Sequence, residues 1–214
     1  MKATNRQQQK ERTREKLLQA AYRVFSRQGI MQSRMEDIAR EAGVSHGTVF
    51  VHFKSQEELT EAVVSYYGGE IAARTHGLSE SGGSLEEVLH ANLMGIGMYE
   101  SFYTRLLLEA RIMPQAARDS FVLIQSVLSL HFTRALAREE AAARTGIPDH
   151  MLFSMWVGLL HHYLQNGDLF SPEGGVIARH GGMLIDSYLR LLNIERRMNH
   201  EDLRSLRDAH DQAF

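Results

Sequence analysis

The sequence contains no cysteine among its 214 residues, and only three prolines. Without cysteine there are no disulfides, no thiolate nucleophile and no cysteine-ligated zinc or iron–sulfur site. Scarce proline permits long helices, because proline interrupts the helical hydrogen-bond ladder. The longest dense apolar stretch, Met151 to Leu160, is about half as long as a membrane span requires. We therefore expect a cytoplasmic protein that does not contact the membrane, and the polar first residues argue against a secretory signal.

The formal net charge of −2 hides an uneven distribution along the chain. Residues 1–34 contain nine lysines and arginines against two acidic residues, whereas residues 61–214 contain thirteen against nineteen. A basic end on an acidic body favours an anionic partner for that end, such as nucleic acid or a membrane surface. The alternative is a solvated basic helix, and charge alone does not separate the two.

Apolar residues recur with helical spacing between sparse turn signals. Leu17, Ala21 and Val24 fall on one face of a first helix, and Gly29 is placed to end it. No segment of the sequence alternates with the two-residue period of a strand. The sequence predicts an all-α fold with helices at about 9–28, 34–42, 46–52, 56–74, 84–99, 101–112, 115–145, 150–165, 173–195 and 200–210.

Several helix starts carry a local signal. Ser33, Ser55 and Ser84 are each followed three residues later by glutamate, which is the pattern of a capping box. Ser45 is placed to cap the short helix that follows it. The glycine- and serine-rich stretch 76–83 predicts a loop.

Three helices within the first 53 residues, the last two joined by a turn at Gly43, have the layout of a helix-turn-helix unit at about 34–53. The segment Asp37–Phe53, with Leu17–Phe25 before it and Lys54–Leu59 after it, resembles the TetR family of bacterial transcriptional regulators. The family usually has threonine where Arg34 stands and often has tyrosine where Phe50 stands.

The resemblance implies a DNA-binding domain at 1–54 and a helical regulatory, ligand-binding and dimerisation domain at 55–198, which leaves a charged tail at 199–214. It also implies that the helix 46–52 enters the major groove of a double-stranded DNA operator. Lys10, Arg12 and Arg14 would add attraction to phosphates. The expected DNA-binding residues are Arg34, Ser45, His46, Gly47, Thr48, Phe50, His52 and Lys54.

In the family, the larger part of the chain encloses a small-molecule pocket. Aromatic residues and methionines suit an adaptable apolar pocket, although the same residues also fill ordinary cores. We expect an aromatic or lipophilic effector of unknown identity, and neither a cofactor nor a metal. The candidate pocket residues are Met94, Met98, Tyr99, Phe102, Tyr103, Phe121, Trp156 and His161.

The last two strong helices would form the interface of a homodimer, by the same resemblance. Two identical halves would read a near-palindromic operator. The candidate interface residues are Met151, Leu152, Met155, Leu159, Ala178 and Leu184.

The sequence therefore predicts a ligand-responsive transcriptional regulator without enzymatic activity, and a repressor is the expected form. One alternative is a DNA-binding regulator that has no small ligand and is controlled by a protein partner. Another is a helical enzyme, which would need a cluster of titratable residues that the sequence does not reveal.

Overall fold

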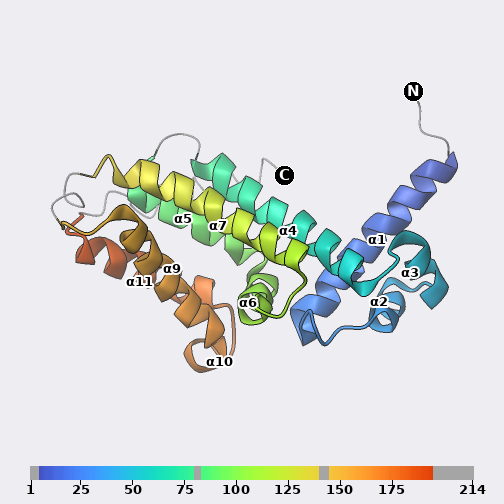
Figure 1. The fold of residues 1–214 in the computed structure, drawn as a ribbon. Helices are drawn as coiled ribbons and strands as arrows, with labels where there is room; N and C mark the ends of the chain where they lie inside the picture. The colour runs from blue at the N-terminus through green and yellow to red at the C-terminus, as the bar shows by residue number, and fades with distance from the viewer. Residues whose placement is uncertain (1–4, 80–82, 140–144, 195–214) are drawn as a thin grey trace. The chain divides into compact units, whose positions relative to one another are not determined.

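The computed structural model describes residues 5–79, 83–139 and 145–194, and in these the regular structure is helical throughout (Figure 1). The predicted all-α fold is confirmed. None of the described helices is long and apolar enough to cross a membrane. The helices are α1 (Asn5–Gln28), α2 (Met35–Ala42), α3 (His46–His52), α4 (Gln56–Ser79), α5 (Leu85–Gly97), α6 (Glu100–Glu109), α7 (Gln115–Leu136), α9 (Asp149–Gln165), α10 (Gly167–Phe170) and α11 (Val176–Leu191).

Some helix boundaries differ from the prediction. α4 continues to Ser79, inside the stretch predicted as a loop. Thr75, which follows the predicted helix end at residue 74, is buried, and packing there overrides local glycine propensity. The predicted loop after Gln165 contains the short α10. The predicted final helix at 200–210 and the tail at 199–214 lie outside the described residues.

The helices form two compact units. The first unit combines Met1–Gly69 with Ser101–Val122, and the second combines Glu70–Glu100 with Leu123–Phe214. The units therefore divide within α4, after the first residue of α6 and within α7. The predicted functional division after residue 54 is a separate matter and stays a prediction.

The core of the first unit joins α1 to the next two helices. Phe25 of α1, Ile38 of α2 and Val49 of α3 are fully buried, and α2 packs against both of its neighbours. Gly43, between α2 and α3, has a φ of 61°. Glycine adopts this left-handed conformation without a steric penalty, so the turn forms where the sequence predicts it.

The core of the second unit is centred on Trp156 of α9 and Tyr188 of α11, whose ring centroids lie 5.5 Å apart. Both side chains are buried and keep a polar partner. The Trp156 indole donates to Asn92 Oδ1 at 3.4 Å, and the Tyr188 hydroxyl donates to the Leu152 carbonyl at 2.7 Å. Burial raises the pKa of Tyr188 above its usual value.

α5 packs closely against α4 in the second unit at Gly95. A Cβ atom on Gly95 would lie 2.6 Å from Thr75 Oγ1 and 3.3 Å from the Ile71 carbonyl oxygen. Because one of these atoms is backbone, a side-chain rotation alone does not make room for the methyl group.

We expect Gly95→Ala to lower the free energy of unfolding by about 1–3 kcal/mol, the usual effect of overpacking. Gly69→Ala is the matched control, because a Cβ atom on this α4 glycine meets nothing within 4 Å and alanine has the better helix propensity. Thermal and urea unfolding of both variants checks this. A Gly95→Ala protein as stable as the wild type would contradict the close packing of α4 and α5.

Candidate nucleic-acid interface

The start of α3 is fixed by Ser45. Its hydroxyl accepts the Thr48 backbone N–H at 3.2 Å and lies 2.8 Å from the Thr48 hydroxyl. The predicted cap is therefore confirmed, because the N-cap oxygen satisfies one of the free N–H groups of the first turn. The same bonds hold both hydroxyl groups at the exposed beginning of the helix.

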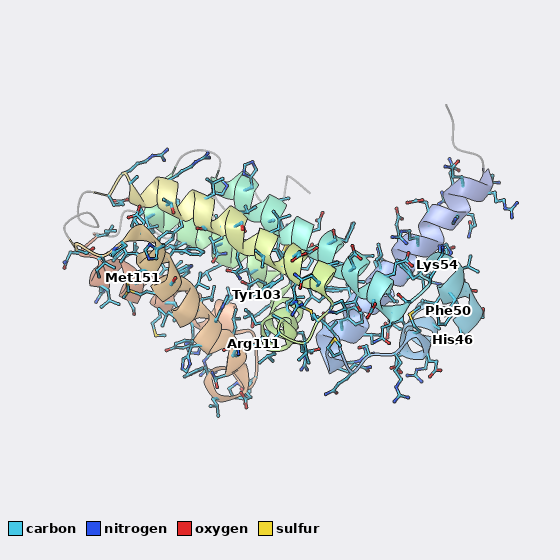
Figure 2. The ribbon with its side chains drawn as sticks, in the orientation of Figure 1. His46, Phe50, Lys54, Tyr103, Arg111 and Met151 are labelled. Atoms are coloured by element: carbon cyan, nitrogen blue, oxygen red, sulfur yellow. The ribbon has the colours of Figure 1, made fainter. Side chains whose placement is uncertain are left out.

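The outward face of α3 combines an imidazole with apolar groups. The His46 and Phe50 rings meet edge to face, with centroids 4.9 Å apart, and both side chains come from α3 (Figure 2). Phe50 is 43% exposed and Val51 is 72% exposed. Val51 was not among the predicted residues, although its place on a helix with buried Val49 marks it as outward-facing.

Gly47 leaves the surface of α3 open near the helix start. A Cβ atom there would meet only the Ser45 hydroxyl, at 3.9 Å. The fold itself therefore does not require glycine at this position. What glycine adds is space beside the backbone, which is the property expected where another molecule approaches closely.

Arg14 of α1 holds the end of α3. Its guanidinium donates to the His52 carbonyl at 3.3 Å and lies 4.3 Å from the centre of the Phe53 ring. A cation is favourable at a helix C-terminus and over an aromatic face. Arg14, which we expected to attract phosphates, therefore has a second task inside the fold.

The surroundings of His52 lower the pKa of its imidazole. Burial lowers its pKa below the usual value, the charges of Lys10 and Arg14 lower it further, and Glu11 opposes them. Its Nδ1 atom is buried and has no hydrogen-bond partner among the described residues. The free protein therefore offers a neutral imidazole at this position near pH 7, rather than a cation.

The start of α2 differs from the prediction. The Ser33 hydroxyl donates to the Gly29 carbonyl instead of capping the helix. Arg34 is the N-cap residue, and its backbone N–H donates to Asp37 Oδ2 at 3.1 Å, a bond that is the main cause of the lowered pKa of Asp37. The predicted pairing of Ser33 with Glu36 is wrong, since Asp37 is the acceptor. The Arg34 side chain is exposed.

Two of the cations near the N-terminus form ion pairs between α1 and α2. Arg23 and Arg27 lie 2.7 Å and 3.3 Å from the two carboxylate oxygens of Glu41, and they lower its pKa. Exposed pairs of this kind contribute little stability each. The exposed cations in residues 5–34 include Arg6, Lys10, Arg12, Lys16 and Arg34.

Lys54 follows α3 in the connection to α4 (Figure 2). Its backbone N–H donates to Glu58 Oε2 at 2.7 Å, and the Glu58 N–H donates to Ser55 Oγ at 3.1 Å. These bonds fix the chain reversal and leave the Lys54 side chain exposed. The predicted helix start at Ser55 is confirmed.

Residues 17–63 match the model of the family described as bacterial regulatory proteins, tetR family. The N-terminal part of the chain is thus similar to the tetR family. The matched stretch contains α2 and α3 completely, together with the C-terminal half of α1 and the first turns of α4. The recognition of the family from sequence is therefore confirmed.

Two curated proteins are similar to the same region. The HTH-type transcriptional regulator SrpR of Pseudomonas putida is 40% identical over 55 residues, which is 26% of each chain. The uncharacterized HTH-type transcriptional regulator YerO of Bacillus subtilis is 28% identical over 109 residues, or 48% of this chain and 37% of YerO. The chain thus matches between a quarter and two fifths of the length of these two relatives.

The likeness of the fold extends further. The transcriptional regulator FadR from Bacillus subtilis, whose structure is in complex with stearoyl-CoA, aligns with a TM-score of 0.65. The alignment covers 81% of this chain and 96% of FadR at 17% identity. At this identity the likeness shows the fold alone.

The eight predicted pocket residues are divided between the two units. Phe102, Tyr103 and Phe121 belong to the first unit, and the other five belong to the second. Among the latter, Met98 is 56% exposed, while burial lowers the pKa of His161 to about 4. A pocket shared by these residues therefore stays a prediction.

The predicted interface residues of the second unit fall into two groups. Leu152 and Leu184 are buried in the core of their own protomer, so their side chains are not available to a partner. Met151 (51% exposed), Met155 (45% exposed) and Ala178 face outward, and Leu159 is half-buried. Met183, which is 47% exposed on α11, was missed, because helical periodicity does not tell which face of an apolar helix is inward.

Histidine, aspartate and glutamate do not form a metal site in the part of the chain that the structure describes, since no three of them cluster there.

We expect Arg14→Met to weaken the attachment of α3. The thioether keeps some contact with Phe53 but loses the cation and the hydrogen bond to His52, which together stabilise the fold by about 1 kcal/mol. Arg12→Met is the matched control, because Arg12 is an exposed cation on the same helix. Thermal unfolding separates the two variants. Equal melting temperatures would show that Arg14 contributes nothing to the docking of α3.

Proposed function

We propose that the protein is a transcriptional regulator that binds double-stranded DNA with α3 in the major groove. The observation that carries the proposal is the arrangement of side chains on α3. The outward side of this helix presents Ser45, His46, Thr48 and Phe50, and Val49 is buried on its inward side. The match of residues 17–63 to the tetR family supports the same assignment.

The chemistry of these side chains suits base edges. An imidazole donates to guanine N7 or O6, a threonine offers a hydroxyl and a methyl group, and Phe50 packs against a thymine methyl. Arg34 and Lys54 are exposed cations suited to phosphates on either side. A phosphate near His52 would offset the burial and the positive neighbours that keep its imidazole neutral.

The regulator acts as a homodimer in this proposal. Met151, Met155, Leu159, Ala178 and Met183 are among the apolar residues of α9 and α11 that are not fully buried in the protomer. An isologous contact through them places two copies of α3 about 34–36 Å apart, or a multiple of that distance. The operator is then a near-palindrome.

The regulator responds to a small lipophilic or aromatic effector, and it acts as a cytoplasmic repressor rather than an enzyme. The structure of FadR with stearoyl-CoA supports a lipophilic effector, since FadR shares the fold. The effector releases DNA by binding better to a conformation in which the two copies of α3 are wrongly spaced. Operator DNA must then weaken effector binding by the same factor.

Capture of host-genome fragments by the purified protein at about 0.15 M salt tests DNA recognition. We expect one enriched near-palindrome, and the double variant His46→Ala/Thr48→Ala should bind it at least about tenfold more weakly, since each base contact contributes about 1–3 kcal/mol. The control His150→Ala/Thr133→Ala changes exposed residues of the second unit and should bind as the wild type does. Diffuse capture that disappears with added salt would overturn sequence-specific binding.

The interface is tested by Met155→Glu, which places a charge on the outward side of α9. We expect the variant to sediment as a monomer at micromolar concentration, because a desolvated unpaired carboxylate opposes association. Leu130→Glu on α7 is the control, since Leu130 has a similar exposed fraction, 47% against 45%. A wild-type protein that is itself monomeric would contradict the dimer.

A further inference from the structure

The turn between α1 and α2, residues 29–33, has backbone groups that its own residues do not satisfy. Gly29 has a φ of 99°, and the N–H groups of the two residues after it donate to a side chain outside the turn. Ile30 is fully buried, whereas Met31 is 41% exposed, so the Ile30 N–H is the less accessible of the two to water. A buried N–H group without an acceptor is costly, so this turn needs an acceptor from elsewhere.

Glu109, the last residue of α6, supplies that acceptor. Its Oε1 accepts the Ile30 N–H at 3.1 Å, and its Oε2 accepts the Met31 N–H at 2.7 Å. The carboxylate lies so close to the chain that a Cβ atom on Gly29 would be 2.7 Å from Oε1. Both oxygens of one side chain thus accept hydrogen bonds from consecutive backbone N–H groups.

Arg105, one helical turn before Glu109, holds the other side of the same turn. Its guanidinium donates to the Arg27 carbonyl at 3.2 Å, in the last turn of α1. Free carbonyls at a helix C-terminus attract cations. α6 therefore presents an acceptor to the N–H groups of the turn and a donor to the helix end before it, and all of these residues belong to the first unit.

The turn also receives one bond from α4, because the Gln56 side chain donates to the Ser33 carbonyl. Ser33 and Arg34 lead directly into α2, and α2 packs on α3. A shift of the turn therefore changes where α2 and α3 lie against α1.

We infer that Glu109, assisted by Arg105, is a positioning residue that sets the placement of α2 and α3 and thereby the affinity for operator DNA. The inference rests on the proposed function. Glu109 touches no DNA in this scheme and acts only through the turn. The core of the unit does not depend on it, because Phe25, Ile38 and Val49 are buried against one another's helices.

Glu109→Gln tests the inference in the full-length protein. Glutamine keeps the shape and one acceptor but turns an N–H donor toward the other backbone N–H group. We expect the operator to be bound about tenfold more weakly, the effect of one bond of this kind left unmade. Affinity for random-sequence DNA at low salt should not fall, because removing a negative charge does not weaken attraction to phosphates.

Glu87→Gln is the matched control. The Glu87 carboxylate accepts the Ser84 N–H at 2.6 Å at the start of α5, in the second unit. This variant loses a comparable bond and should bind the operator as the wild type does. If Glu109→Gln fails to fold, Arg105→Met replaces it, with about threefold weaker operator binding expected from the loss of one weaker bond.

The outcomes separate the two proposals. A wild-type protein that selects no DNA sequence overturns the proposed function, and the inference falls with it. A wild-type protein that selects an operator, together with a folded Glu109→Gln variant of equal operator affinity, overturns the inference alone. Equal weakening by Glu87→Gln would also overturn it, because general destabilisation would then explain the loss.

Discussion

Two hydrogen bonds, from the backbone of Ile30 and Met31 to the Glu109 carboxylate, join two distant stretches of the chain within the first unit. α1 is followed by Gly29, which has a left-handed conformation. The N–H groups of the next two residues, Ile30 and Met31, then need an acceptor. That acceptor comes from a residue 79 positions after Ile30. The unit is discontinuous, because it combines α6 from Ser101 onward and the first part of α7 with α1, α2, α3 and the first part of α4.

Local sequence signals predicted much of this fold because helix ends are satisfied mostly by near neighbours. Ser45 and Ser84 cap α3 and α5 as expected. The prediction of a cap at Ser33 was wrong. The Ser33 hydroxyl donates to the Gly29 carbonyl, and the Arg34 N–H donates to Asp37 rather than to Glu36. A sequence with acidic residues at both positions does not tell which one lies within reach.

Contacts between residues far apart in the sequence could not be predicted from comparable local patterns. Arg14 and Glu109 look like ordinary charged residues on exposed helical faces until the fold places a carbonyl or an N–H group beside them. The faces of α9 were equally hard to assign, since Leu152 is buried while Met151 and Met155 are exposed. Periodicity identifies a helix that is apolar on most sides, but only its packing identifies which side the protomer uses.

α3 has seven residues, too few for a helix that is stable by itself in water. Its stability comes from three supports: the Ser45 cap at one end, Arg14 at the other, and Val49 in the core. Phe50 and Val51 stay exposed and add little to the fold. Ser45 both caps the helix and lies on its outward side, whereas Arg14 and Val49 hold the helix without facing outward. Substitutions on the outward side can alter what α3 recognises while the cap, the cation and the buried valine keep the helix in place.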